Sequence, residues 1–94
     1  YEILERNFHA LRGEIDIIAK KENTIVFTEV KYRKNETMGT PAEAVDSRKQ
    51  QRLRSAAELY LAANELDVPV RFDVAEVYDE GGSLRISYIE NAFM

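Results

Sequence analysis

The 94 residues are enough for one compact domain that buries its core without a bound metal or a disulfide, so we expect a single domain over residues 1–94. Hydrophobic residues make up 45% and charged residues 32% of the chain, and no apolar run approaches the ~18 residues of a membrane span. The chain has no cysteine, which excludes disulfides, Cys-ligated zinc and a thiol nucleophile, and suits a reducing compartment.

The first half of the chain reads as strands. Residues 1–8, "YEILERNF", form a weakly patterned first strand, and "GEIDIIAK" and "TIVFTEVKY" are β-branched runs of strand length that flank a polar "KEN" turn. Further along, "VPVRFDVAEVYDEGGSLRISYIE" predicts a second hairpin, with "DEGG" as its turn.

Between the two hairpins the pattern changes to that of a helix. Thr40 offers an N-cap, Pro41 a first helical residue and Glu43 a capping-box partner, so a helix of about 20 residues begins there or at Asp46. Apolar residues follow at helical spacing: Leu53, Ala56, Ala57, Tyr60, Leu61 and Ala63. The elements together predict an α/β domain, a mixed sheet of about five strands with one long helix packed on it.

The net charge of −4 argues against nucleic acid, but its distribution does not. Residues 31–54 carry seven basic and three acidic residues, a balance of +4, which leaves the rest of the chain at −8. The basic residues are Lys31, Arg33, Lys34, Arg48, Lys49, Arg52 and Arg54. This basic edge fits either a bound polyanion or a solvated helix face, and charge alone favours the second. Cations at a helix N-terminus oppose the helix dipole, which favours the first.

The first hairpin has a register that hydrophobic matching selects. With residues 21–24 as its loop, the opposed pairs are Ile18 with Phe27, Ala19 with Val26, Ile17 with Thr28, Asp16 with Glu29, Ile15 with Val30 and Glu14 with Lys31. A shift by one residue would set Asp16 against Thr28 and mix carboxylates into the apolar face. The selected register therefore predicts that Asp16 and Glu29 lie side by side.

Two facing carboxylates cost stability unless a cation lies between them. Lys31 supplies part of that charge, and two converging carboxylates suit a hard divalent ion such as Mg²⁺. The alternative is an exposed sheet edge with a Glu14–Lys31 ion pair and no chemistry. The residues alone leave both interpretations open.

Asp16 followed by Glu29-Val30-Lys31 resembles the PD-(D/E)xK nuclease motif. A longer match covers nearly the whole chain: "ILERNF", "RGEIDIIA", "VFTEVKYR", "PAEAVDSRKQQRL", "RFDV" and "IENAF". In order and spacing these segments resemble the YraN-like family of predicted bacterial endonucleases, which is related in fold to archaeal Holliday junction resolvases. The resemblance implies a restriction-endonuclease-like core in a cytoplasmic protein that uses a metal to attack phosphodiesters in DNA, branched DNA included, and it allows a homodimer.

The resemblance also implies roles for individual residues. Asp16, Glu29 and the Val30 carbonyl would bind Mg²⁺ or Mn²⁺, while Lys31 would orient the attacking water and stabilise charge on the phosphate. Glu14 shares their face as a supporting acid. Gln50 and Lys49 lie where related nucleases place a polar residue near the phosphate. The nucleic-acid contacts would come from Arg33, Lys34, Arg48, Lys49, Arg52 and Arg54.

In one respect the chain departs from the pattern that the resemblance implies. A helix before "YEILERN" would contribute another acid, but this chain begins at Tyr1, and Glu2 and Glu5 are poor substitutes. Two other functions therefore stand beside an endonuclease: a non-catalytic nucleic-acid-binding module with a relic acidic site, and an interaction protein.

Two further polar residues are expected to be structural. The single histidine, His9, reads as a surface residue, and Asp73 in "RFDV" reads as a residue on the polar face of its strand or one buried with a partner such as Arg71 or Arg85.

Overall fold

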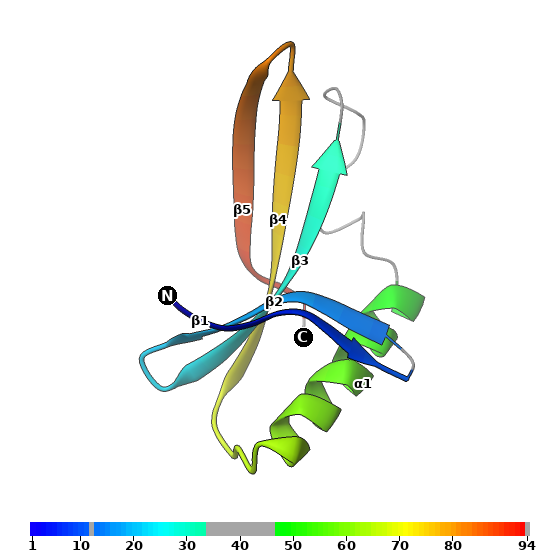
Figure 1. The fold of residues 1–94 in the computed structure, drawn as a ribbon, viewed down its shortest axis with the longest axis vertical. Coiled ribbons are helices and arrows are strands. Elements are labelled where there is room, and N and C mark those ends of the chain that lie inside the picture. Colours follow the sequence, from blue (N-terminus) through cyan, green and yellow to red (C-terminus); the bar gives the residue numbers. More distant parts are fainter. Residues whose placement is uncertain (12, 34–46, 94) are drawn as a thin grey trace.

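The computed structural model describes residues 1–11, 13–33 and 47–93, which form a five-stranded sheet with one helix against it (Figure 1). The elements are β1 (Glu2–Ala10), β2 (Gly13–Lys21), β3 (Thr24–Arg33), α1 (Ser47–Ala63), β4 (Val70–Glu80) and β5 (Ser83–Phe93). The strands lie in chain order, with β3 and β4 parallel and the other neighbours antiparallel. This arrangement confirms the predicted mixed sheet and the α/β class.

The core lies between α1 and one face of the sheet. The predicted apolar stripe of the helix is buried at Leu53, Ala56, Ala57 and Tyr60, whereas Leu61 is half-buried and Ala63 exposed. The Tyr60 ring contacts Phe8 and Phe27 edge-on, at centroid distances of 5.4 and 6.1 Å. Burial of this stripe supplies most of what holds the helix on the sheet, at about 25 cal/mol per Å² of apolar surface.

The register of the first hairpin is the predicted one, with Ile18 opposite Phe27 and Ile17 opposite Thr28. The predicted four-residue loop is wrong, however. Lys21 pairs with Thr24, so the turn contains two residues, and Glu22 takes the left-handed backbone conformation with φ 57°. The tight turn lengthens both strands by one residue pair.

Beyond Ile17 and Thr28 the strands β2 and β3 separate. β2 stays with β1 as far as Gly13, while β3 continues along β4 to Arg33, so the sheet forks at Asp16 and Glu29. In Figure 1 the β1–β2 hairpin runs at a steep angle to the other three strands. The predicted opposition of Ile15 to Val30 is therefore wrong, because the fully buried Ile15 joins the core cluster under α1 and turns β2 away.

The predicted helix start at Thr40 or Asp46 lies outside the described residues. The helix that the structure describes has 17 residues and begins at Ser47. In the second hairpin the turn is Gly81–Gly82, both at positive φ, and Asp79 and Glu80 belong to β4. Within the described ranges no helix is long and apolar enough to cross a membrane.

Candidate functional site at the fork of the sheet

The Asp16 carboxylate occupies the point where β2 leaves β3. Its Oδ2 accepts a hydrogen bond of 2.8 Å from the backbone N–H of Val30, so a side chain satisfies a backbone donor where the ladder has ended. The Glu29 carboxyl lies close enough to Asp16 for the negative charge of Asp16 to raise its pKa. The structure thus brings together the two acids that the register predicts side by side.

Glu29 is a buried acid with a raised pKa. It is 8% exposed, and burial, followed by the negative charge of Asp16, raises the pKa of Glu29 above its usual value. The positive charges of Lys49 and Lys31 oppose this shift without cancelling it. Lys49 Nζ lies 3.4 Å from Glu29 Oε1, so an ammonium group from α1 faces the buried acid.

Glu29 and Lys49 line an open cleft of about 1070 Å³ between the β1–β2 hairpin and the first turns of α1, whereas Asp16 and Lys31 are not part of its lining. Its polar lining includes His9, Glu14, Glu29, Arg48, Lys49 and Arg52. The close approach of β2 to α1 requires Gly13, because a Cβ there would lie 2.8 Å from the Arg52 carbonyl oxygen. A larger residue at position 13 would displace α1, whose residues Arg48, Lys49 and Arg52 form the basic wall of the cleft.

Glu14 and His9 form the rim of the cleft. His9 Nδ1 lies 3.1 Å from Glu14 Oε2, and both side chains are exposed. Because β2 and β3 have separated, Glu14 does not oppose Lys31, and the predicted Glu14–Lys31 pair is wrong. His9 is a surface residue as expected, but the sequence did not reveal its place in the cleft, which follows from its pairing with Glu14 across β1 and β2.

The basic residues of the helix divide between two surfaces. Arg48 and Arg52 are exposed and line the cleft, whereas the Arg54 guanidinium lies 5.7 Å from the centre of the Phe93 ring and does not line the cleft. Gln50 is half-buried, and the cleft is lined by Gln51 in its place. The side chain of Arg33 and all of Lys34 lie outside what the structure describes.

Glu76 is a buried acid that the sequence did not single out. It is 1% exposed, accepts a 2.5 Å hydrogen bond from the Tyr78 hydroxyl, and lies opposite Lys31 in the parallel pairing of β3 with β4. Adjacent residues of neighbouring strands point to the same face, so Glu76 adds negative charge beside Lys31. A prediction of the β3–β4 register would have been needed to find it.

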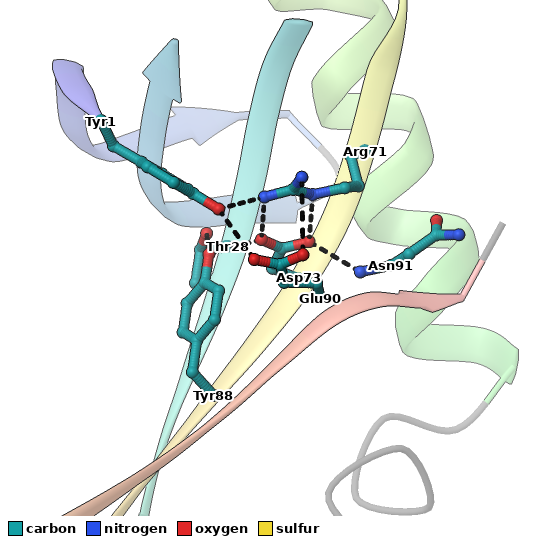
Figure 2. A network of polar contacts seen from close by, with 7 residues as sticks. All are labelled: Tyr1, Thr28, Arg71, Asp73, Tyr88, Glu90 and Asn91. Atoms are coloured by element: carbon teal, nitrogen blue, oxygen red, sulfur yellow. Dashed lines mark hydrogen bonds and ion pairs between the residues drawn. The ribbon is translucent and has the colours of Figure 1, made fainter. Parts of the chain in front are cut away.

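A second polar cluster lies on the face of the sheet away from α1 and is structural (Figure 2). Asp73 is fully buried and accepts two hydrogen bonds of 2.9 Å from Arg71, one from the Tyr88 hydroxyl and one from the Asn91 backbone. Burial and Asp73 raise the pKa of Tyr88 to about 12, so the hydroxyl stays a donor. Of the alternatives expected for Asp73, the structure shows burial with Arg71 as its partner.

The donor set at the fork suits a hard cation. Asp16 and Glu29 offer carboxylate oxygens and Val30 a carbonyl, and Mg²⁺ is bound in proteins by one or two carboxylates with retained waters. Among the described residues no group of three or more His, Cys, Asp or Glu side chains gathers at one point. The residues present therefore fit a two-carboxylate Mg²⁺ or Mn²⁺ site.

The mixed sheet and the helix between its parallel strands define an α/β domain that is consistent with a restriction-endonuclease-like core. The chain belongs to the Uncharacterised protein family UPF0102, whose profile matches residues 1–77. It is 46% identical over 94 residues to a UPF0102 protein of Syntrophomonas wolfei, covering 99% of this chain and 82% of that protein. It is 50% identical over 100 residues to a UPF0102 protein of Acetivibrio thermocellus, covering 99% and 77%. The family resemblance is confirmed.

The raised pKa of Glu29 gives a pH-dependent prediction. Between the unfolded value of 4.5 and the higher folded pKa, the folded state holds the extra proton, so stability falls as pH rises through this window. Without metal, Glu29→Gln should be more stable than the parent near neutral pH by about 0.5–1 kcal/mol. The difference should vanish below the unfolded pKa. Thermal melts across pH measure it, with the exposed Glu58→Gln as control, and a gap independent of pH would contradict it.

Proposed function

We propose that this domain is a metal-dependent endonuclease that hydrolyses phosphodiester bonds of DNA in the cleft beside the fork. The observation that carries the proposal is the placement of Asp16 and the buried Glu29 next to Lys31. Two carboxylates held together in a desolvated place cost stability. Such an arrangement is explained if a divalent ion occupies it during function.

Each residue of the fork has a distinct task in this proposal. Asp16, Glu29 and the Val30 carbonyl would hold Mg²⁺ or Mn²⁺, which polarises a phosphoryl oxygen and lowers the pKa of water. The hydrogen bond from Val30 to Asp16 fixes that carboxylate relative to β3. Lys31 orients the attacking water and stabilises charge that develops on the phosphate. Lys49 pairs with Glu29 and lies where it can also contact a phosphate.

DNA would lie along the basic wall of the cleft, with Arg48 and Arg52 on its backbone. Such contacts position DNA without reading its sequence, so little base preference is expected. Branched DNA as the preferred form rests on the family resemblance. A reducing, cytoplasmic location suits a chain without cysteine.

The second candidate is a nucleic-acid-binding module without turnover. Among the described residues Asp16 and Glu29 lie together at the fork without a third acidic ligand, and this favours a module that does not cleave DNA. It shares the basic cleft with the nuclease proposal, but it requires no divalent ion.

The test incubates the full chain with duplex and four-way-junction DNA in the presence and absence of Mn²⁺. We expect cleavage only with metal, and a loss of about 100-fold or more in Glu29→Gln, which removes a metal ligand and leaves the basic wall intact. DNA bound by the parent but never cleaved under any metal condition would support the binding module instead.

The same assay includes a charge control for binding. Reversing Arg48 and Arg52 to Glu should weaken DNA binding at least tenfold and reduce its salt dependence, because fewer counterions are released on binding. Lys20→Glu changes an exposed lysine that does not line the cleft and should leave binding nearly unchanged. Equal affinities for parent and double variant would show that the wall is only solvated surface.

A further inference from the structure

The strand β5 lies at the edge of the sheet and is paired, within the described residues, with β4 alone. Leu84, Ile86 and Tyr88 are 63%, 67% and 40% exposed. Tyr88 reaches Asp73 on the face away from α1, so strand alternation places Leu84 and Ile86 on that same face. An apolar strand with free backbone donors and acceptors is a template for pairing with another chain.

The part of this edge from Ser83 to Ile89 lacks the usual features that discourage pairing, since the irregularity in the β4–β5 register lies beyond Ile89. Residues 83–89 contain no proline and one charge, Arg85, whose guanidinium lies over the Tyr78 ring, 4.2 Å from its centre. The exposed apolar surface continues inward across the sheet, since Ile86 pairs with Val77 and Val77 with Tyr32, which is 68% exposed. In Figure 1 the β4–β5 hairpin extends beyond the end of β3.

The charge of the hairpin argues against nucleic acid as that partner. Residues 70–93 carry two basic and five acidic residues, a net charge of −3. A polyanion would be repelled, whereas a protein strand that pairs with residues 83–89, which contain no acidic residue, would bury the apolar row and satisfy the backbone groups of this edge.

We propose that β5 pairs antiparallel with β5 of a second copy of this chain, with Ile86 on the two-fold axis. A two-fold axis normal to the sheet places one residue opposite its own copy. With Ile86 there, Leu84 opposes Tyr88 of the second copy on the apolar face, and Arg85 opposes Ser87 on the other. An axis at Arg85 would set two arginines against each other, and one at Ser87 would set Leu84 against Glu90. Only the Ile86 register matches both faces.

The pairing has a consequence that rests on the proposed function. A two-fold axis normal to the sheet leaves both α1 helices on the same side of a continuous sheet. The two clefts would then open on one side, where a single DNA molecule can reach both. The dimer itself requires neither DNA nor metal, so it can be tested without either.

The test is sedimentation of the full chain over a range of concentrations, without DNA or metal. The parent should be a dimer, and Ile86→Lys should be a monomer with an unchanged far-UV CD spectrum. Leu59→Lys, a matched change of a 52% exposed leucine on α1, should remain dimeric. A monomeric parent, or an Ile86→Lys variant that still dimerises, would overturn the proposal.

A cross-link keeps the register testable if Ile86→Lys fails to fold. The chain has no cysteine, so Ile86→Cys introduces a single thiol directly opposite its own copy, and the closest cross-strand Cβ separation of about 4.5 Å is at the upper end of the range that disulfides bridge. Mild oxidation should convert Ile86→Cys almost fully to a covalent dimer, whereas Leu59→Cys should stay uncross-linked. Equal cross-linking of the two variants would refute the proposed register.

Discussion

Replacing Asp73 with alanine should lower the free energy of unfolding by about 3–5 kcal/mol, because it removes the buried, hydrogen-bonded anion of a largely buried arginine. The Arg71 side chain is 20% exposed and donates two hydrogen bonds to Asp73. The Tyr88 hydroxyl and the Asn91 N–H would lose their acceptor as well. Urea unfolding followed by far-UV CD measures the loss.

The cost is large because Asp73 also supports an irregularity in the sheet. The β4–β5 register shifts between Phe72 and Val74, and Asn91 on β5 takes a positive φ of 53°. The Asn91 N–H donates to Asp73, so the carboxylate satisfies a backbone donor beside the irregularity. Asp73→Asn should be intermediate, since an amide offers one acceptor atom instead of two.

Glu90 provides the matched control for this network. Its carboxylate lies 3.9 Å from Arg71 and its side chain is 57% exposed, so Glu90→Gln should change stability by about 0.5 kcal/mol or less. If Asp73→Ala were as mild as Glu90→Gln, the buried network would not be holding β5 in place.

Local patterns predicted the hairpin because the information lies within a short segment. Apolar residues on both faces of β2 and β3 select one register, and that register brings Asp16 to Glu29. The fork could not be predicted in this way. It depends on Ile15 packing under α1, a contact between segments far apart in the chain.

Other parts of the site also divide into features that a short segment predicts and features that depend on contacts between distant segments. Lys49 reaches Glu29 only through the docking of α1, and Glu76 lies beside Lys31 only through the parallel register of β3 and β4. The position of Arg54 was predictable. Arg48 and Arg52 are four residues apart and share a helix face, whereas Arg54 follows Arg52 by two and points elsewhere.

Lys31→Ala should separate cleavage from binding. Removing the ammonium that stabilises charge on the phosphate should reduce cleavage by about 10²–10³-fold, the usual cost of one such group. DNA binding should be largely retained, because Arg48 and Arg52 still line the cleft. The stabilisation that Mn²⁺ gives in a thermal melt should also remain, since both carboxylates are intact.

The acid variants should show the opposite pattern. Mn²⁺ that binds only the folded parent raises its melting temperature by mass action, and Asp16→Asn and Glu29→Gln should each abolish this rise. Without metal they should differ from each other. Glu29→Gln relieves a buried charge and gains stability near neutral pH, whereas Asp16→Asn keeps an oxygen for the Val30 N–H and should stay near the parent.

Asp16→Ala removes the side-chain oxygen that accepts the hydrogen bond from the Val30 N–H. It should lower the free energy of unfolding by about 1–3 kcal/mol, because that N–H is left unsatisfied. A melting series with and without Mn²⁺ on the parent, the two acid variants and Lys31→Ala therefore distinguishes a metal site from a structural acid pair. Glu14→Gln is the control, since its exposed carboxylate pairs with His9 at the rim. If Mn²⁺ did not change the melting temperature of the parent, the metal site would be ruled out, and the proposed endonuclease activity with it.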